Sequence, residues 1–379
     1  MNFSWNHSII VFALGCKLFT GTATSDPDQT AGAVVTFLHG NVTIRSQNKD
    51  IKPSIGYLVR TGDTVITEIG AIDLQTYRGD VIRVKESSSV VFKELSGEKH
   101  SASTLEVAFG NLLVKSNKLK SNQSFQINSP TMVAGVRGTA FTFELEKGGV
   151  PKVKVFEGAV AVGYRSPSDV INSNELVSKE TLNRFIKTLE NYEVVLEPGE
   201  ASAMDPKINE MIFLINSKIA ENKLTDSELD GFKVSEADLQ KTEFKVSPRE
   251  NAELETLVLI DKDLVSSKLS ELQSITTPTT EFSEKVDSLH ETERKLAFVR
   301  ISKEAESKKL DDESEIQNHY SILETIHKSN GEVLSGAIVA QLGDTFIVHS
   351  TKGVFELDVN DIEYIEYKNF KVKTKAKAK

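Results

Sequence analysis

Residues 132–145 read MVAGVRGTAFTFEL, an apolar run that contains a single arginine, Arg137. Glycine and β-branched residues are dense here and weaken helices, so we expect a strand. In a continuous strand, Arg137 shares a face with Phe141 and Phe143, and these two large side chains mark the buried side. Arg137 therefore points into the core or onto its rim, unless Gly138 forms a bulge that reverses the register.

The role of Arg137 has two interpretations. A buried guanidinium has five donors, which hold several carbonyl groups at strand ends or pair with a carboxylate such as Glu157. Alternatively, Arg137 grips an anionic ligand beside Gly135 and Gly138. Neither a second cation nor a phosphate-binding loop accompanies it in the sequence, so the pattern favours the structural role.

The same pattern of short alternating strands recurs on both sides of this stretch. Gly-Asn or Gly-Asp breaks the alternation at residues 40–41, 62–63 and 79–80, and a similar signature returns at 109–116 and 156–164. These dipeptides adopt positive φ easily and mark tight turns. The predicted fold class is mixed α and β in several domains, with a β-rich roll or solenoid-like first domain.

These residues resemble a known domain family. SFQINSPTMVAGVRGTAFTFEL and the following KVKVFEGAVAV are similar to the core of the FecR domain, and LHGNVTI, LVRTGDTVIT and GDVIRV are similar to its opening strands. VVLEPGEASAM resembles its closing strand and turn. The likeness covers residues 33–204, with an apparent helical insertion at about 165–191, in which we expect Ser178 to cap the helix. The signature residues, which we interpret as structural, are Pro130, Gly135, Arg137, Gly138, Thr139 and Gly158.

The resemblance implies an exported, β-rich protein. The best-known members of the family relay ferric-siderophore signals across the inner membrane to a sigma factor. This sequence shows no cytoplasmic N-terminal segment and no spanning helix before the β-rich domain, so we do not expect transmembrane sigma regulation. It is more similar to the FecR-domain lipoproteins of spirochaete envelopes, in which the domain is a binding module at the surface or in the periplasm.

The N-terminus, MNFSWNHSIIVFALGCKLF, has the apolar core of an export signal at residues 9–14, and this core is too short to span a membrane. Cys16 is the only cysteine in the chain and follows Ala-Leu-Gly. This order resembles the lipobox of bacterial lipoproteins, in which the cysteine sulfur carries diacylglycerol. Ordinary cleavage after Ala23 and an uncleaved signal are the alternatives. We expect a signal peptide over residues 1–16 and a flexible tether over 17–32.

Residues 205–330 read as an acidic helical region. Residues 200–329 hold 28 acidic against 17 basic side chains, and this excess of 11 accounts for the formal net charge of −10 of the chain. Such a charge disfavours nucleic acid as a partner. Asp205-Pro206 and the capping box Ser247–Glu250 are helix starts. Apolar residues at helical spacing favour a bundle that packs on itself over the alternative, a groove for a partner helix.

The last part of the chain alternates again. Residues 331–370 contain short apolar strands with glycine at the breaks, which predict a small SH3-like or Sm-like β-barrel. Residues 371–379 form a basic tail. This tail is either solvated or in contact with anionic lipid or peptidoglycan carboxylates.

The sequence shows no pattern for catalysis. It lacks a P-loop, G-x-S-x-G and G-x-G-x-x-G, and its seven histidines are scattered. We therefore predict a protein that is not an enzyme and uses neither cofactor nor metal.

The predicted function is that of an exported bacterial envelope lipoprotein, anchored to the outer membrane in preference to the inner. Its FecR-like domain binds or scaffolds another envelope protein or peptidoglycan. The alternatives are a FecR-type regulator, which passes a ligand signal to a membrane partner, and a surface adhesin.

Overall fold

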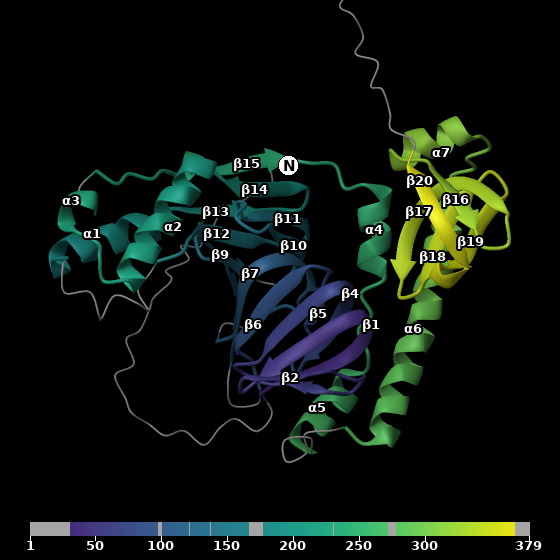
Figure 1. The fold of residues 1–379 in the computed structure, drawn as a ribbon, viewed down its shortest axis with the longest axis horizontal. Coiled ribbons are helices and arrows are strands. Elements are labelled where there is room, and N and C mark those ends of the chain that lie inside the picture. Colours follow the sequence, from purple (N-terminus) through teal and green to yellow (C-terminus); the bar gives the residue numbers. More distant parts are fainter. Residues whose placement is uncertain are drawn as a thin grey trace, which may run out of the picture.

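A computed structural model describes residues 31–97, 101–120, 122–136, 138–166, 177–229, 231–271 and 278–367. Figure 1 shows a β-sandwich at the centre, three helices beside one end of it, and a long helix with a small barrel on the opposite side. Strands predominate over helices in the described residues. The predicted mixed, strand-rich fold class is therefore confirmed.

Three long strands build the sandwich because each runs through both of its layers. They are β1 (Ala33–Ser46), β4 (Thr64–Thr76) and β7 (Ala102–Lys115). In β1 and β4, Gly40 pairs with Gly70 where the strands cross between the layers, and β7 bends at Gly110. A Cβ on Gly40 would lie 2.1 Å from the Ile69 carbonyl oxygen, so the bend requires glycine. The sequence predicted a turn between two strands at Gly40, and this was wrong, because β1 continues through it as one bent strand.

The two layers divide the other strands between them. The first layer joins the first half of β1 and the second halves of β4 and β7 with β3 (Leu58–Val59), β5 (Val81–Val84), β10 (Ala140–Leu145), β11 (Lys152–Glu157), β14 (Glu200–Met204) and β15 (Leu239–Glu243). The second layer joins the remaining halves with β2 (Lys49–Ile51), β6 (Ser88–Glu94), β8 (Ser124–Asn128), β9 (Met132–Val136), β12 (Val160–Tyr164) and β13 (Glu193–Leu196). Alternate side chains of each strand therefore face the space between the layers.

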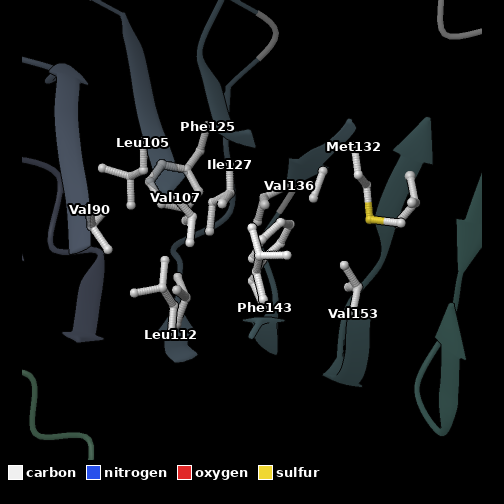
Figure 2. Close-up of a cluster of buried hydrophobic side chains, with 14 of the residues drawn as sticks. Val90, Leu105, Val107, Leu112, Phe125, Ile127, Met132, Val136, Phe143 and Val153 are labelled. Atoms are coloured by element: carbon white, nitrogen blue, oxygen red, sulfur yellow. The ribbon is translucent and has the colours of Figure 1, made fainter. Parts of the chain in front are cut away.

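The hydrophobic core fills this space between the layers (Figure 2). Phe125 and Phe143 contribute its largest side chains in the close-up, with Leu105 and Leu112 beside them. The sequence predicted that Phe141 and Phe143 mark the buried side of their strand. Both side chains are fully buried, so this prediction is confirmed.

A helical cap covers one end of the sandwich. It consists of α1 (Lys179–Glu190), α2 (Pro206–Ala220) and α3 (Asp226–Leu229). Ser178 caps α1 as its sequence predicted, since its hydroxyl accepts a hydrogen bond from the Thr181 amide. The apolar side chains of α1 and α2 join the sandwich core, and Phe185 contacts Phe232 edge to face at 4.8 Å.

The helices after β15 also pack on the sandwich. These are α4 (Pro248–Glu255), α5 (Lys262–Glu271) and α6 (Thr280–Ser307). Val258, Val265 and Phe282 from this part of the chain bury themselves against Val34 and Leu58 of the first layer. The expectation of a self-packed bundle over residues 205–330 was therefore wrong. The apolar residues at helical spacing are buried as expected, but a sheet face and the barrel cover them.

The small barrel is confirmed. Helix α7 (Glu313–Tyr320) precedes β16 (Glu324–Lys328), β17 (Val333–Leu342), β18 (Thr345–Ser350), β19 (Gly353–Asp358) and β20 (Ile362–Tyr367), and β16 lies between β17 and β20. The barrel starts earlier than residue 331, because Ser321 adopts a left-handed conformation that ends α7. Ile326, predicted to be helical, consequently lies in β16. The barrel packs on α4 and α6 through residues that include Ala252 and Ile301.

Helix α6 meets β1 at a buried histidine. His290 is only 5% exposed, and its ring stacks on Phe37 at a centroid distance of 5.0 Å. Its Nε2 has no hydrogen-bond partner among the described residues. Burial lowers the pKa of His290, and the charges of Arg83 and Arg294 lower it further, whereas those of Asp73 and Asp287 oppose the shift.

Stability is therefore expected to fall in mild acid. Because the folded pKa lies below the unfolded value, the unfolded chain binds the proton at a higher pH. The contribution of His290 is complete above a pH of about 6.5 and is lost as the pH falls. His290→Phe should flatten the plot of unfolding free energy against pH by up to about 1.4 kcal/mol per pH unit. Urea titrations between pH 5 and 8, followed by circular dichroism, measure this slope. An unchanged slope would contradict the assignment.

Candidate partner-binding surface

Three of the signature residues meet at one corner of the sandwich. Gly138 lies between β9 and β10, and Gly158 lies between β11 and β12, both with positive φ. A Cβ on Gly158 would lie 2.3 Å from the Gly138 carbonyl oxygen, and one on Gly138 would lie 2.9 Å from Lys118 Cα. Thr139 is buried, and its carbonyl accepts a hydrogen bond from the Ser116 amide at 2.8 Å. The close approach of these backbones explains why glycine occupies both turns.

This packing predicts unequal costs for the same glycine substitution. Gly158→Ala should lower the free energy of unfolding by at least about 2 kcal/mol more than Gly148→Ala. Gly148 also has positive φ, but no atom lies within 4 Å of a Cβ built on it. The control therefore measures only the left-handed backbone cost, about 1–2 kcal/mol. Urea unfolding of both variants is the measurement, and equal losses would rule out the backbone clash.

The other signature residues have different positions. The carbonyl of Pro130 faces α2, and Gly135 lies in β9 with space for a side chain, since the nearest atom to a built Cβ is 3.8 Å away. Arg137 and Cys16 lie outside the described residues. The structure therefore brings Gly138, Thr139 and Gly158 together and leaves Pro130 and Gly135 apart from them.

Two other arginines are the buried cations of the described chain. Arg78 donates from Nη1 to the Ser101 carbonyl at 2.9 Å and from Nη2 to Asp80 at 3.3 Å. Arg83 forms a bidentate pair with Asp73, with both distances 2.7 Å. These two residues are buried struts, the role that the sequence analysis predicts for Arg137, and for Arg137 it stays a prediction. The alternation in QTYRGDVIRV was the available signal, because it places Arg83 on the strand face opposite Ile82 and Val84.

Helix α2 is anchored to the sandwich along one side. Asn216 Nδ2 donates to the Pro130 carbonyl at 2.9 Å, and Asn209 Nδ2 donates to the Gly149 carbonyl at 3.3 Å. The Thr131 hydroxyl donates to Asn209 Oδ1 at 2.6 Å. Ile212, Ile215 and Ile219 are buried in the same interface. These contacts hold α2 rigidly, with its other side in solvent.

The solvent side of α2 carries an unusual group of apolar residues. Met211, Phe213 and Leu214 are 42%, 58% and 53% exposed. We call these three side chains the α2 surface. Single exposed apolar residues are common, whereas three within four consecutive positions of an anchored helix form an uncovered apolar group. The sequence analysis assigned this helix to a self-packed bundle and missed the surface, because periodicity does not show which apolar side chains stay uncovered.

Two hollows lie on the described part of the molecule. A partly open one of about 20 Å³ lies among α4, α6, α7 and β17, which is room for roughly one water. A second depression is open to solvent and is lined by polar side chains of α1. In the described ranges, no three histidine, cysteine or acidic side chains gather as a metal site. None of the helices described is both long and apolar enough to cross a membrane.

Part of the chain matches a known protein family. Residues 67–161, from β4 to β12, match the family model described as "FecR protein". Two crystal structures of a "putative anti-sigma factor" from Parabacteroides distasonis ATCC 8503 align at 11% and 12% identity with TM-scores of 0.27. The alignments cover 37% of this chain and 52% of those chains, about half their length. No curated protein matches the sequence. The match to the FecR family model therefore covers the part of the chain that carries the stacked glycine turns and the anchoring site of α2.

Proposed function

We propose that the protein is an exported envelope lipoprotein, anchored through Cys16, whose FecR domain is a non-catalytic scaffold for a partner protein. The FecR domain and the ALGC order at residues 13–16 support this role. An outer-membrane location is part of the proposal. Neither nucleic acid nor a cofactor has a place in it.

The α2 surface is the observation that carries the proposal. It lies on the convex, exposed side of a helix, so it fits a partner with an apolar groove. Two lysines in this part of the chain are paired, since Lys218 contacts Glu228 and Lys223 contacts Glu221. We therefore assign the partner as another envelope protein with an apolar groove, held mainly by burial of apolar area and only weakly sensitive to salt.

Crosslinking in intact cells tests the partner assignment. The wild type should give a discrete crosslinked species, and the double variant Phe213→Ser, Leu214→Ser should lose most of it. The matched control is Val333→Ser, which alters an equally exposed apolar residue, 54%, on the barrel. Loss of the species in both variants, or in neither, contradicts the role of the α2 surface.

Metabolic labelling tests the anchor separately. A clickable palmitate analogue should label the wild type and not the Cys16→Ala variant. Membrane fractionation of the labelled cells then tests the outer-membrane location. Equal label in both proteins would show that Cys16 carries no lipid, whatever the outcome for the partner.

A FecR-type regulator is the second candidate, and the family match at residues 67–161 favours it. In that role the FecR domain passes a ligand signal to a membrane partner. Neighbouring genes for a sigma factor or a TonB-type receptor support the regulator. Their absence, together with a crosslinked partner of unrelated kind, supports the scaffold.

A further inference from the structure

Strand β20 forms an exposed edge of the small barrel. It pairs with β16, and no other described strand pairs with it. Four of its six residues are exposed, namely Glu363, Tyr364, Glu366 and Tyr367. A strand with a free side presents unpaired backbone amide and carbonyl groups, through which a further strand can add. The free side of β20 is therefore a surface that fits an extended segment.

The side chains of β20 select the charge of that segment. Glu363 and Glu366 place two carboxylates on the strand, and the Glu366 side chain is 60% exposed, with one oxygen 3.7 Å from His327 Nε2. Tyr364 stacks on the His327 ring of β16 at a centroid distance of 4.1 Å, with the rings 13° from parallel. Because His327 covers the ring face on the β16 side, the other face looks toward the free edge. An aromatic face beside carboxylates attracts an ammonium group, so the edge repels acidic segments and fits a lysine-rich one.

The chain carries such a segment directly after β20. Residues 370–379 read FKVKTKAKAK, in which lysine alternates with apolar or small residues. In an extended strand, this alternation places all five lysines on one face and the apolar residues on the other. These residues lie outside those that the structure describes. Only Lys368 and Asn369 separate them from the end of β20 at Tyr367, so the segment is tethered beside the edge.

The segment and the edge match in one register. An antiparallel hairpin with Lys368 and Asn369 in its turn would return the chain along β20, and asparagine tolerates the positive φ that such a turn needs. This register places the following side chains opposite one another: Tyr367 and Phe370, Glu366 and Lys371, Ile365 and Val372, Tyr364 and Lys373. They are an aromatic pair, an ion pair, an apolar pair and a cation beside a ring. A shift by one residue in either direction would put a lysine opposite Ile365 and an apolar residue opposite Glu366.

We propose that the free side of β20 is a strand-addition site, and that residues 370–373 of the same chain occupy it in this register. Ile365 gains from the added strand, because it belongs to the apolar cluster of the barrel with Ile326 and Ile338 and is only partly buried. The lysines of the tail then bind the barrel in preference to anionic lipid or peptidoglycan. This inference does not depend on the α2 surface or on the lipid anchor.

Paired cysteines test the register in the full-length chain. In a Cys16→Ala background, the variant Tyr364→Cys, Lys373→Cys places two thiols directly opposite each other, and mild oxidation should join them within one molecule. The matched control Tyr364→Cys, Thr374→Cys moves the second thiol to the opposite face of the added strand. It should form at least about tenfold less of the intramolecular disulfide in the same time. Mass spectrometry of the digested proteins measures both yields.

Two outcomes of the oxidation overturn the proposal. Equal yields from the two variants would show that residues 370–373 are not held in one register on β20. A disulfide that forms mainly between two molecules, seen as a dimer on a non-reducing gel, would show that the tail of a second copy takes the edge.

Peptide binding gives an independent test without cysteines. Fluorescein-labelled FKVKTKAKAK should bind a variant that ends at Lys368 at least about tenfold more tightly than the full-length protein, in which the tethered tail competes for the edge. The control peptide FVTAAKKKKK has the same composition and charge without the alternation, and it should bind the shortened variant weakly. Fluorescence anisotropy is the readout. Equal binding of the probe to both proteins, or equal binding of both peptides, would show that β20 does not select this strand.

Discussion

Asp73→Ala should lower the free energy of unfolding by about 3–5 kcal/mol, because it leaves the Arg83 guanidinium buried without its carboxylate. Both members of this pair are inaccessible, with side-chain exposures of 11% for Arg83 and 0% for Asp73. Water cannot solvate the remaining charge unless residues 256–260 separate from the first layer. Urea unfolding followed by far-ultraviolet circular dichroism measures the loss.

A second aspartate–arginine pair in the same sandwich is the control. Arg45 and Asp50 also form a bidentate contact, but both side chains are at least half exposed. Asp50→Ala should cost far less than Asp73→Ala, since the remaining Arg45 is exposed and hydrated. If the two alanine variants lose equal stability, the Asp73–Arg83 pair does not behave as a buried ion pair.

Phe143→Ala is the second substitution with a large expected effect, about 3–5 kcal/mol of unfolding free energy. Its ring is fully buried in the core between the layers, among Phe125, Leu112 and Val153 (Figure 2). Removing the ring leaves a cavity. The long strands β1, β4 and β7 are fixed where they bend at glycine, so they cannot close the space.

The same chemical change at Phe213 is the matched control. This side chain is 58% exposed on α2, so Phe213→Ala should change stability by no more than about 0.5 kcal/mol. Thermal and urea unfolding of both variants give the comparison. A large loss at Phe213 would show that its ring packs against the protein, and the α2 surface would then not be free for a partner.

Local features were predicted well from the sequence. The turns at residues 62–63 and 79–80, the cap at Ser178 and the capping box at Ser247 are where the sequence placed them. Each depends on residues within a few positions of one another, so a single stretch contains all the information. The error at Gly40 has the same origin, because a positive φ is needed by a turn and by a bent strand alike.

The site was less predictable than the fold. The signature residues include those that meet at the corner of Gly138, Thr139 and Gly158, and Pro130, which contacts α2. The α2 surface, however, depends on which side of an amphipathic helix packs on the rest of the protein. The cover over the first layer depends on contacts between distant parts of the chain: Gln75 and Ile260 are 185 residues apart, and Arg83 and Thr256 are 173 apart. No local pattern indicates such a pairing.

The sequence by itself determined which side chains share a face, through the period of two in the strands and the spacing of apolar residues in the helices. It also determined where the chain bends, through glycine. Only the tertiary structure decided what covers each face: residues 256–260 lie over Gln75 and Arg83 of the first layer, and Phe213 and Leu214 of α2 stay exposed to solvent. The physical reason is that backbone geometry orients a side chain locally, whereas burial depends on segments that are distant in the chain and close in space.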